Sequence, residues 1–419
     1  MGNGDNRMKE MKLSDGRMSE SIGQMEDNLM DVTHPFYRDT WAEINLNAIH
    51  DNVWAINRSL PEETEMMAVV KANAYGHGAV DVAREALAAG ATYLGVAILD
   101  EAIALRKAGV DAKILVLGYI RAEDILIASE LNIAVTVFQL DWLKQAASIL
   151  EAAGKDIVCH VKLDSGMGRI GLRKEAEIRE LAHALKTMDE FDVEGLYTHM
   201  ATADELSSDY YAVQKERFIT MISWFEETLE RTVGIRHCAN SASALRFHEE
   251  ICNLVRVGIS MYGMPPSVEM TPVMPVKLTQ AMSLHSRITH VKQMEPGEGI
   301  SYGMSYKTKG NEWIATIPIG YADGWIRAHQ SGDVLVNGKR AKIVGRICMD
   351  QMMVLLEEPV EPGTVATLIG ENQGGFISMD EVAGRIGTIS YEIPCTLSYR
   401  VPRAVRKDGR LLYVHNDIF

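Results

Sequence analysis

Short apolar runs alternate with amphipathic helical stretches from about residue 66 to residue 260. The apolar runs are strand candidates, at residues 66–71, 93–98, 114–118, 134–137, 157–164, 193–199, 235–240 and 254–260. Helical patterns lie between them, as at residues 80–89, 101–108, 142–153, 175–186 and 211–231. Strands that are short, apolar and separated by helices predict a parallel sheet covered on both faces.

Eight such strands match the number in a closed (β/α)8 barrel, the α/β architecture that we expect over residues 41–277. An open doubly wound sheet is the alternative, because periodicity alone does not show closure. A strand-like segment that begins at Trp41 and a helix over residues 47–60 precede the barrel strands.

Helical patterns nearly stop after residue 262. Alternating segments follow at residues 282–291, 313–319, 333–336, 341–347, 352–356 and 364–369, separated by turn signals such as Asn337-Gly338. One short helix is predicted over residues 378–386, where Ser378 and Glu381 have the spacing of a capping box. We therefore expect a mostly antiparallel β domain over residues 278–419, with residues 35–45 as candidates to pack with it.

Composition and charge narrow the class of protein. Residues 1–34 are polar, rich in methionine and aperiodic, which predicts a disordered or non-native N-terminal extension. The net charge of −15 argues against binding to nucleic acid or to an anionic membrane. No apolar run approaches the roughly 18–20 residues of a membrane helix, and no signal peptide pattern is present. The five cysteines lack the spacing of metal ligands, so we expect reduced thiols in a cytoplasmic protein without a metal.

Polar residues stand where the predicted barrel strands end, and barrel enzymes carry their active sites at that end. Lys71 closes the first strand, where burial lowers the pKa of an amine and makes it a nucleophile toward an aldehyde. An exposed lysine that merely ends a strand is the plain alternative. Gly76 and Gly78 permit a tight turn after it, and Tyr75 either reaches a bound phosphate or only packs.

The fifth strand ends in two basic residues. Arg169 follows it in a glycine-rich loop, where its guanidinium is suited to bind a carboxylate or phenolate oxygen. Lys162 points inward from the strand itself. Two buried cations are unfavourable together unless something neutralises one of them.

Strands six to eight carry the remaining candidates, which are His199, Asn240, Ser241, Arg256, Gly258 and Ile259. Ser241 at a helix start and amides near Gly258 suit a phosphate dianion. An ordinary helix cap and close packing are the plain alternatives. Together with the lysine on the first strand, a phosphate site suggests pyridoxal phosphate.

Nine ordered motifs resemble those of the alanine racemases and cover nearly everything from Pro35 onward. Residues 70–78, with the sequence VKANAYGHG, look like the cofactor-lysine motif of that family. The other motifs lie at residues 162–171, 198–205, 237–245, 256–263, 301–303, 319–324, 348–351 and 398–403.

The resemblance implies a site for pyridoxal 5′-phosphate linked to Lys71. Arg256 is then expected to face the pyridine nitrogen, and Arg169 to bind the ring phenolate and the substrate carboxylate. The phosphate would be held by Tyr75, Ser241, Gly258, Ile259 and Tyr399, with His199 and Asn240 as further cofactor contacts. In similar enzymes the lysine at the position of Lys162 is carboxylated, which would replace the conflict of two cations by an ion pair.

The resemblance also implies a homodimer with shared active sites. Tyr302 would cross from the partner subunit and exchange the α-proton of the L-isomer, while Lys71 exchanges that of the D-isomer. The backbone of Met349 would contact the substrate carboxylate, with Asp350 bracing the same loop and Tyr321 nearby.

The implied activity is alanine racemisation, an isomerase reaction that supplies D-alanine for cell-wall synthesis. Bulky Tyr302, Tyr321 and Tyr399 would leave room for a methyl group, although serine is only one hydroxyl larger. A serine or broader racemase is therefore one alternative. A barrel-type decarboxylase would be expected to have a carboxylate where Arg256 stands. A cofactor carrier would lack the β domain, and a barrel using Lys71 without a cofactor would have no purpose for Arg256.

Overall fold

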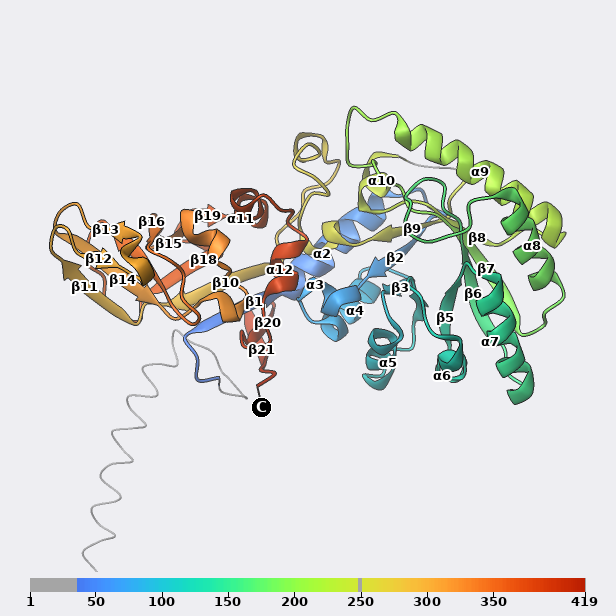
Figure 1. The fold of residues 1–419 in the computed structure, drawn as a ribbon, viewed down its shortest axis with the longest axis horizontal. Coiled ribbons are helices and arrows are strands. Elements are labelled where there is room, and N and C mark those ends of the chain that lie inside the picture. The colour runs from blue at the N-terminus through green and yellow to red at the C-terminus, as the bar shows by residue number, and fades with distance from the viewer. Residues whose placement is uncertain (1–35, 248–250, 419) are drawn as a thin grey trace, which may run out of the picture.

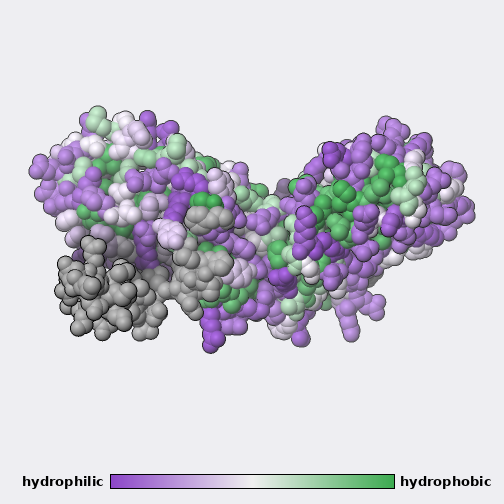
Figure 2. All heavy atoms as spheres, turned by 90° about the horizontal axis from the view of Figure 1, so that it is seen from below, coloured by the Kyte–Doolittle hydropathy of each residue, from purple (hydrophilic) through white to green (hydrophobic). Residues whose placement is uncertain are grey.

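The computed structural model describes residues 36–247 and 251–418, so the extension predicted at residues 1–34 lies outside the described residues. Figure 1 shows two units side by side, with a barrel on the right and a sheet domain on the left. Figure 2 shows the same two lobes from below, mostly polar at the surface, with apolar side chains gathered in a hollow of the barrel lobe.

The barrel consists of parallel strands, as the sequence predicts. They are β2 (Glu65–Val69), β3 (Tyr93–Val96), β4 (Lys113–Val116), β5 (Ile133–Val137), β6 (Ile157–Lys162), β7 (Phe191–Tyr197), β8 (Ile235–His237) and β9 (Leu254–Val257). They pair in the order β8-β7-β6-β5-β4-β3-β2-β9.

Two backbone hydrogen bonds join the ends of this order. Asn253 donates to the carbonyl of Arg236 over 3.1 Å, and Arg256 donates to that of Ala239 over 3.0 Å. The barrel is therefore confirmed, and the open doubly wound sheet is wrong.

Helices cover the outside of the barrel (Figure 1). They are α2 (Leu46–Ser59), α4 (Ala79–Ala88), α5 (Leu99–Lys107), α6 (Ile125–Glu130), α7 (Leu140–Ala153), α8 (Glu175–Lys186), α9 (Tyr210–Leu229) and α10 (Ser241–Arg246). In α8 the buried residues Ile178, Leu181 and Leu185 recur every three or four positions, which places one apolar stripe against the strands.

The second unit is a mostly antiparallel sheet, again as predicted. Its strands are β1 (Thr40–Asn45), β10 (Met282–Arg287), β11 (His290–Met294), β14 (Glu312–Ile317), β15 (Asp333–Val336), β16 (Lys339–Val344), β17 (Met352–Leu356), β18 (Val365–Asn372), β19 (Gly375–Ile377), β20 (Arg403–Lys407) and β21 (Arg410–His415). The segment predicted as one strand over residues 282–291 is two strands. A separate small hairpin is formed by β12 (Gly299–Ile300) and β13 (Tyr306–Lys307).

Two short helices complete this unit, α11 (Met379–Ile386) and α12 (Glu392–Thr396). Ser378 caps α11 by accepting a hydrogen bond from the backbone of Glu381, as the capping-box spacing predicts. No helix in the described parts of the chain is both long and apolar enough to span a membrane.

The strand β1 connects the two units. It pairs with β10 in antiparallel and with β20 in parallel orientation, and the chain then continues directly into α2 on the barrel. The N-terminal segment of the described chain therefore belongs to the sheet, and the next segment belongs to the barrel.

Candidate active site

A cavity of about 960 Å³ opens at the carboxyl ends of the barrel strands. Its lining includes ten of the residues that the sequence singles out, namely Lys71, Tyr75, Lys162, Arg169, His199, Asn240, Ser241, Arg256, Gly258 and Ile259. These residues come from five separate regions of the chain, and the barrel brings them together.

Lys71 opens a left-handed turn. The strand β2 ends at Val69, and the five residues of α3 (Lys71–Tyr75) follow. The φ angles of Ala72, Asn73, Ala74 and Tyr75 all lie between 51° and 54°. The expectation that Lys71 closes the strand is therefore wrong by two residues, because a pattern of apolar positions carries no information on the sign of φ.

Neighbouring side chains hold this turn in place. The carboxylate of Glu101 accepts a hydrogen bond from the backbone of Ala72 over 2.6 Å, and the side chain of Asn73 accepts one from the backbone of Ala79 over 2.8 Å. Gly76 continues the turn with a φ of 79°, and a Cβ atom there would lie 2.3 Å from the carbonyl oxygen of Pro394. The turn is thus fixed both from α5 and from α12.

The environment of Lys71 favours a neutral amine. Burial, followed by the positive charge of Arg169, lowers the pKa of Lys71 from its ordinary value. A neutral amine has the lone pair that attack on an aldehyde requires.

Neutral donors gather at the end of the cavity formed by the loops after β8 and β9. The backbone of Gly258 donates to the hydroxyl of Ser241 over 2.9 Å, and a Cβ atom at Gly258 would lie 2.6 Å from the oxygen of Tyr75. The Tyr75 ring contacts that of Tyr262, with 4.7 Å between centroids, and burial raises the pKa of Tyr75. Two hydroxyls and the backbone amides of this loop fit a phosphate group.

Asn240 has a structural role within this loop. Its side-chain oxygen accepts from the backbone of Ser243 over 3.0 Å, and its nitrogen donates to the carbonyl of Met200 over 3.2 Å. Asn240 therefore caps α10 and helps to place Ser241.

Arg256 is buried and fixed by both terminal nitrogens. They donate to the carbonyls of Thr198, His237 and Cys238 and to ring nitrogens of His199 and His237, over 2.8–3.3 Å. Within the described chain no hydrogen bond is found for Nε. That N–H is the donor of Arg256 that remains for a ligand in the cavity.

Lys162 is a buried amine next to cations. Its Nζ lies 4.1 Å from the centroid of the Tyr197 ring. Burial, and then the charges of Arg256 and Arg169, lowers the pKa of Lys162 well below its ordinary value. Arg169 follows on an exposed loop that Asp164 orders by accepting from the backbone of Gly168 over 3.0 Å. The buried cation next to Lys162 is therefore Arg256, while Arg169 acts on Lys162 from the exposed loop.

The other predicted residues lie outside the lining of this cavity, and they are Tyr302, Tyr321, Met349, Asp350 and Tyr399. Tyr302 and Tyr399 are 71% and 63% exposed. Around the loop after β16, Ser301 donates to the carbonyl of Arg346 over 2.6 Å, and Tyr321 donates through its backbone to that of Cys348 over 3.1 Å. We call this exposed group around residues 301–304, 321, 349–350 and 399 the sheet-domain surface.

Both domains match known families. Residues 44–266 match the family model for the N-terminal domain of alanine racemase, and residues 281–405 match that for its C-terminal domain. The chain belongs to the alanine racemase family.

Relatives in this family cover almost the whole chain. The alanine racemase of Geobacillus kaustophilus is 53% identical over 383 residues, which are 91% of this chain and 98% of that protein. Alanine racemase 1 of Bacillus subtilis is 47% identical over 92% of this chain and 98% of its own length. The crystal structure of the Bacillus anthracis alanine racemase with bound L-Ala-P aligns with a TM-score of 0.89 at 48% identity, over 92% of this chain and 99% of that one. The family resemblance inferred from the motifs is confirmed.

Proposed function

We propose that this chain is an alanine racemase that uses pyridoxal 5′-phosphate to interconvert L-alanine and D-alanine. One observation carries the proposal, namely that the amine of Lys71, a guanidinium with a remaining donor and a set of phosphate-binding groups line one cavity. Relatives named alanine racemase that match over about nine tenths of the chain support the choice of substrate.

The lining of the cavity fits this cofactor. Tyr75, Ser241 and the amides of Gly258 and Ile259 would hold its phosphate, and Arg169 would bind its phenolate oxygen. When bound to an amino acid, pyridoxal phosphate withdraws electrons from the α-carbon and so acidifies the α-proton.

Arg256 would set the electronic character of a bound cofactor. An arginine N–H donates and never accepts, so a ring nitrogen that faces Nε would have to be unprotonated. Such a ring withdraws electrons less strongly than a protonated one. The arrangement favours the return of the proton to the same carbon and disfavours transamination, in which the amino group would leave with the cofactor.

Proton exchange on two faces needs two groups. Lys71 is placed to remove and return the proton on one face of the α-carbon. Tyr302 lies between β12 and β13, at the far end of the sheet domain from the barrel (Figure 1), so we expect the phenol at the second face to come from a partner subunit. This placement supports a homodimer with shared sites.

His199 is suited to assist that phenol. Its Nδ1 faces a donor of Arg256 at 3.2 Å, which leaves Nε2 to carry the proton. Burial, and then the charge of Arg256, lowers the pKa of His199 well below its ordinary value and keeps the ring neutral. A neutral N–H donor would stabilise a phenolate, whose ordinary pKa of about 10 makes it otherwise hard to form.

The sheet-domain surface would close the substrate site from the partner. Met349 would offer its backbone to the substrate carboxylate, and Asp350 is held by Arg400 over 2.8 Å. Tyr321 and Tyr399 would limit the space for a side chain, which favours alanine and leaves serine as a minor substrate. A cytoplasmic supply of D-alanine for the cell wall is the corresponding role.

The test compares the wild-type chain with Lys71→Ala and with Lys144→Ala, a control on the barrel exterior. Wild type and control should show a cofactor absorption band above about 400 nm and convert L-alanine to D-alanine in chiral chromatography. Lys71→Ala should lose the band and lose activity by about 10³-fold or more. A yellow protein that is inert on alanine but racemises serine would correct the substrate. A colourless protein that pyridoxal phosphate does not reconstitute would refute the proposal.

A further inference from the structure

A chain of hydrogen bonds runs through the barrel core away from the active-site cavity. Arg256 contacts Nδ1 of His237 over 2.9 Å, and Nε2 of His237 contacts Nδ1 of His160 over 2.9 Å. Nε2 of His160 then contacts the carboxylate of Glu194 over 3.1 Å. The four residues come from β9, β8, β6 and β7, and the chain reaches the amino-terminal end of the barrel.

The structure makes room for this chain. Gly195 lies opposite His160 on the neighbouring strand, and a Cβ atom at Gly195 would lie 2.2 Å from the His160 ring. The His237 ring stacks on Tyr197 with 4.5 Å between centroids, which fixes its plane.

The two ends of this hydrogen-bond chain, Arg256 and Glu194, determine which ring nitrogen of each histidine carries the proton. Arg256 only donates, so Nδ1 of His237 has to accept and the proton of a neutral ring sits on Nε2. That Nε2–H donates to Nδ1 of His160, whose own proton is then on Nε2 and points at Glu194. Burial lowers the pKa of His160, and burial followed by the charge of Arg256 lowers that of His237 well below its ordinary value, which keeps both rings neutral.

Glu194 is anchored as an anion at the outer end. Lys113 contacts its Oε1 over 2.5 Å, and the hydroxyl of Tyr93 donates to Oε2, the same oxygen that His160 contacts. Burial alone would raise the pKa of Glu194, but hydrogen bonds from His160, Lys113 and Tyr93 lower it to about 2.

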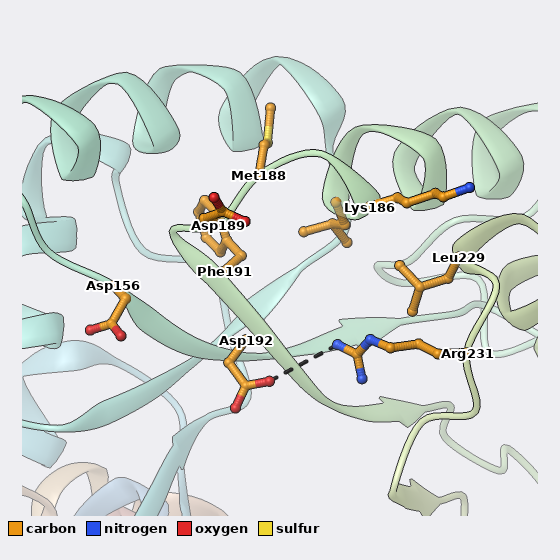
Figure 3. Close-up of a pocket in the computed structure, with 9 residues that line it drawn as sticks. Asp156, Lys186, Met188, Asp189, Phe191, Asp192, Leu229 and Arg231 are labelled. Atoms are coloured by element: carbon orange, nitrogen blue, oxygen red, sulfur yellow. Dashed lines mark ion pairs between the residues drawn. The ribbon is translucent and has the colours of Figure 1, made fainter.

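This outer end faces a cavity of about 390 Å³ lined by Tyr93, Lys113 and Glu194. Asp156 and Asp192 line both that cavity and the adjoining hollow drawn in Figure 3, where Asp192 pairs with Arg231. Glu194 is therefore reached from the face of the barrel opposite the active site.

We propose that Glu194 is a positioning residue that, through the tautomers of His160 and His237, holds Arg256 with its Nε directed to the cofactor. This inference rests on the proposed function for the role of Arg256 alone. Arg256 has no ion pair in the described residues, and the two imidazoles connect its charge to the anion of Glu194. Without an acceptor at Oε2, either ring could turn its N–H toward the next donor, and Arg256 would lose one of the bonds that hold it.

The test uses the full-length holoenzyme labelled with ¹⁵N-histidine and reads two quantities. Ring-nitrogen NMR reports the tautomers of His160 and His237, and the ratio of pyruvate released to alanine racemised reports transamination. In Glu194→Leu we expect the Nδ1–H tautomer at one or both rings and a ratio about tenfold higher, since a hydrogen bond to a charged group contributes about 1.5 kcal/mol or more. A general loss of folded protein lowers both activities and leaves their ratio unchanged.

Two matched variants complete the design. Asp192 lies on the same strand as Glu194 but takes no part in this hydrogen-bond chain. Asp192→Asn should therefore leave the histidine tautomers and the ratio of pyruvate to racemised alanine as in the wild type. Glu194→Gln should restore both relative to Glu194→Leu, because its carbonyl can accept from His160 in the position of Oε2 while the exposed side chain of Lys113 turns away from the amide.

Three results would overturn the inference. They are wild-type tautomers and ratio in Glu194→Leu, an equal change in Asp192→Asn, or no recovery in Glu194→Gln. If Glu194→Leu does not fold, His160→Phe breaks the same chain, and an unchanged ratio in it is contradictory. A purified protein without the cofactor absorption band would refute the proposed function instead. The histidine tautomers would still show whether the hydrogen-bond chain from Arg256 to Glu194 is present.

Discussion

Lys162 illustrates how one buried residue can require a chemical modification. Its amine lies among Arg169, Arg256 and the Tyr197 ring, and its lowered pKa makes it neutral and nucleophilic. A neutral amine adds to carbon dioxide, forming an N–C bond and releasing a proton, and the resulting carbamate is an anion. We propose that this modification converts Lys162 into an ion-pair partner of Arg169.

Replacing Lys162 tests that proposal. In Lys162→Ala we expect activity to fall by about 10²-fold, because Arg169 loses the anion that orients it. Acetate should restore part of the activity by occupying the vacated space. Wild type in ¹³C-bicarbonate should give a carbamate NMR signal that the variant lacks. Absence of both the signal and the rescue would show that the lysine is unmodified.

His329 predicts a loss of stability in acid. Burial, and then the charge of Arg385, lowers its pKa to about 4, against about 6.5 in an unfolded chain. At pH values between these two pKa values, only the unfolded state binds the proton. The contribution of neutral His329 to the free energy of unfolding is therefore complete above pH 6.5 and is lost as the pH falls toward 4. The total for this residue is roughly 3 kcal/mol.

His329→Phe isolates this contribution. It keeps the stacking on Trp325, where 4.1 Å separates the ring centroids, and removes the titration. The difference in free energy of unfolding between variant and wild type should be constant above pH 6.5 and shift in favour of the variant below it. A difference that does not vary with pH would contradict the assignment.

Single residues differ in how far the sequence reveals them. Lys71, Arg169 and Arg256 stand near or beyond the carboxyl ends of strands, where barrel geometry gives polar residues a purpose, and the structure places all three at one cavity. His160 and Glu194 stand within strands, among apolar residues, and nothing in the pattern distinguishes them from ordinary polar positions. Only the register of β6 against β7, which shifts at His160, shows that the two side chains meet.

Among the elements, the left-handed turn after β2 has a measurable energetic consequence. An L-residue in that conformation costs roughly 1–2 kcal/mol, and glycine avoids most of this. Ala72 is exposed with a φ of 54°, so Ala72→Gly should raise the free energy of unfolding by about 0.5–1 kcal/mol after the entropic cost of glycine.

The same substitution in a right-handed helix gives the control. Ala104 is exposed within α5, and Ala104→Gly should lower the free energy of unfolding by about 1 kcal/mol. Denaturant titration of both variants measures the two signs. Equal destabilisation by both would show that the turn is not left-handed in solution.

The elements that the sequence predicts well are short apolar runs with polar residues on both sides. The bounds predicted for β15 and β17 agree with the structure because Asn337-Gly338 ends the apolar run of β15, and Gln351 and Glu357 flank that of β17. The strands β20 and β21 escape prediction because charged residues such as Arg403, Arg406 and Lys407 interrupt the pattern. Arg403 is nevertheless buried, where it donates to the carbonyls of Leu397, Ser398 and Val401.

For the whole molecule, the proposed shared active sites predict complementation between two inactive chains. Lys71→Ala and Tyr302→Phe each remove one group from every site of their own homodimer. In a hybrid dimer, one site carries both substitutions and the other carries neither. Random mixing of equal amounts should therefore restore about a quarter of the wild-type activity, since half of the dimers are hybrids with one intact site in two.

Mixing should be done under conditions that exchange subunits, with activity followed by chiral chromatography. The control mixes Lys71→Ala with Lys71→Ala/Tyr302→Phe, a pair in which no site is intact. Activity that stays at the level of this control would mean that Lys71 and Tyr302 do not act across a subunit boundary.

The position of β1 also affects how the chain is made. Its residue Ala42 pairs with Arg403, which is 361 positions later, and its other partner β10 begins at residue 282. At about 5–20 residues per second, a ribosome needs roughly 20–70 seconds between the two halves of the β1–β20 pair. The whole barrel is synthesised in that interval and can fold while β1 still has both edges unpaired. The first strand of the described chain to be synthesised is thus among the last to be enclosed.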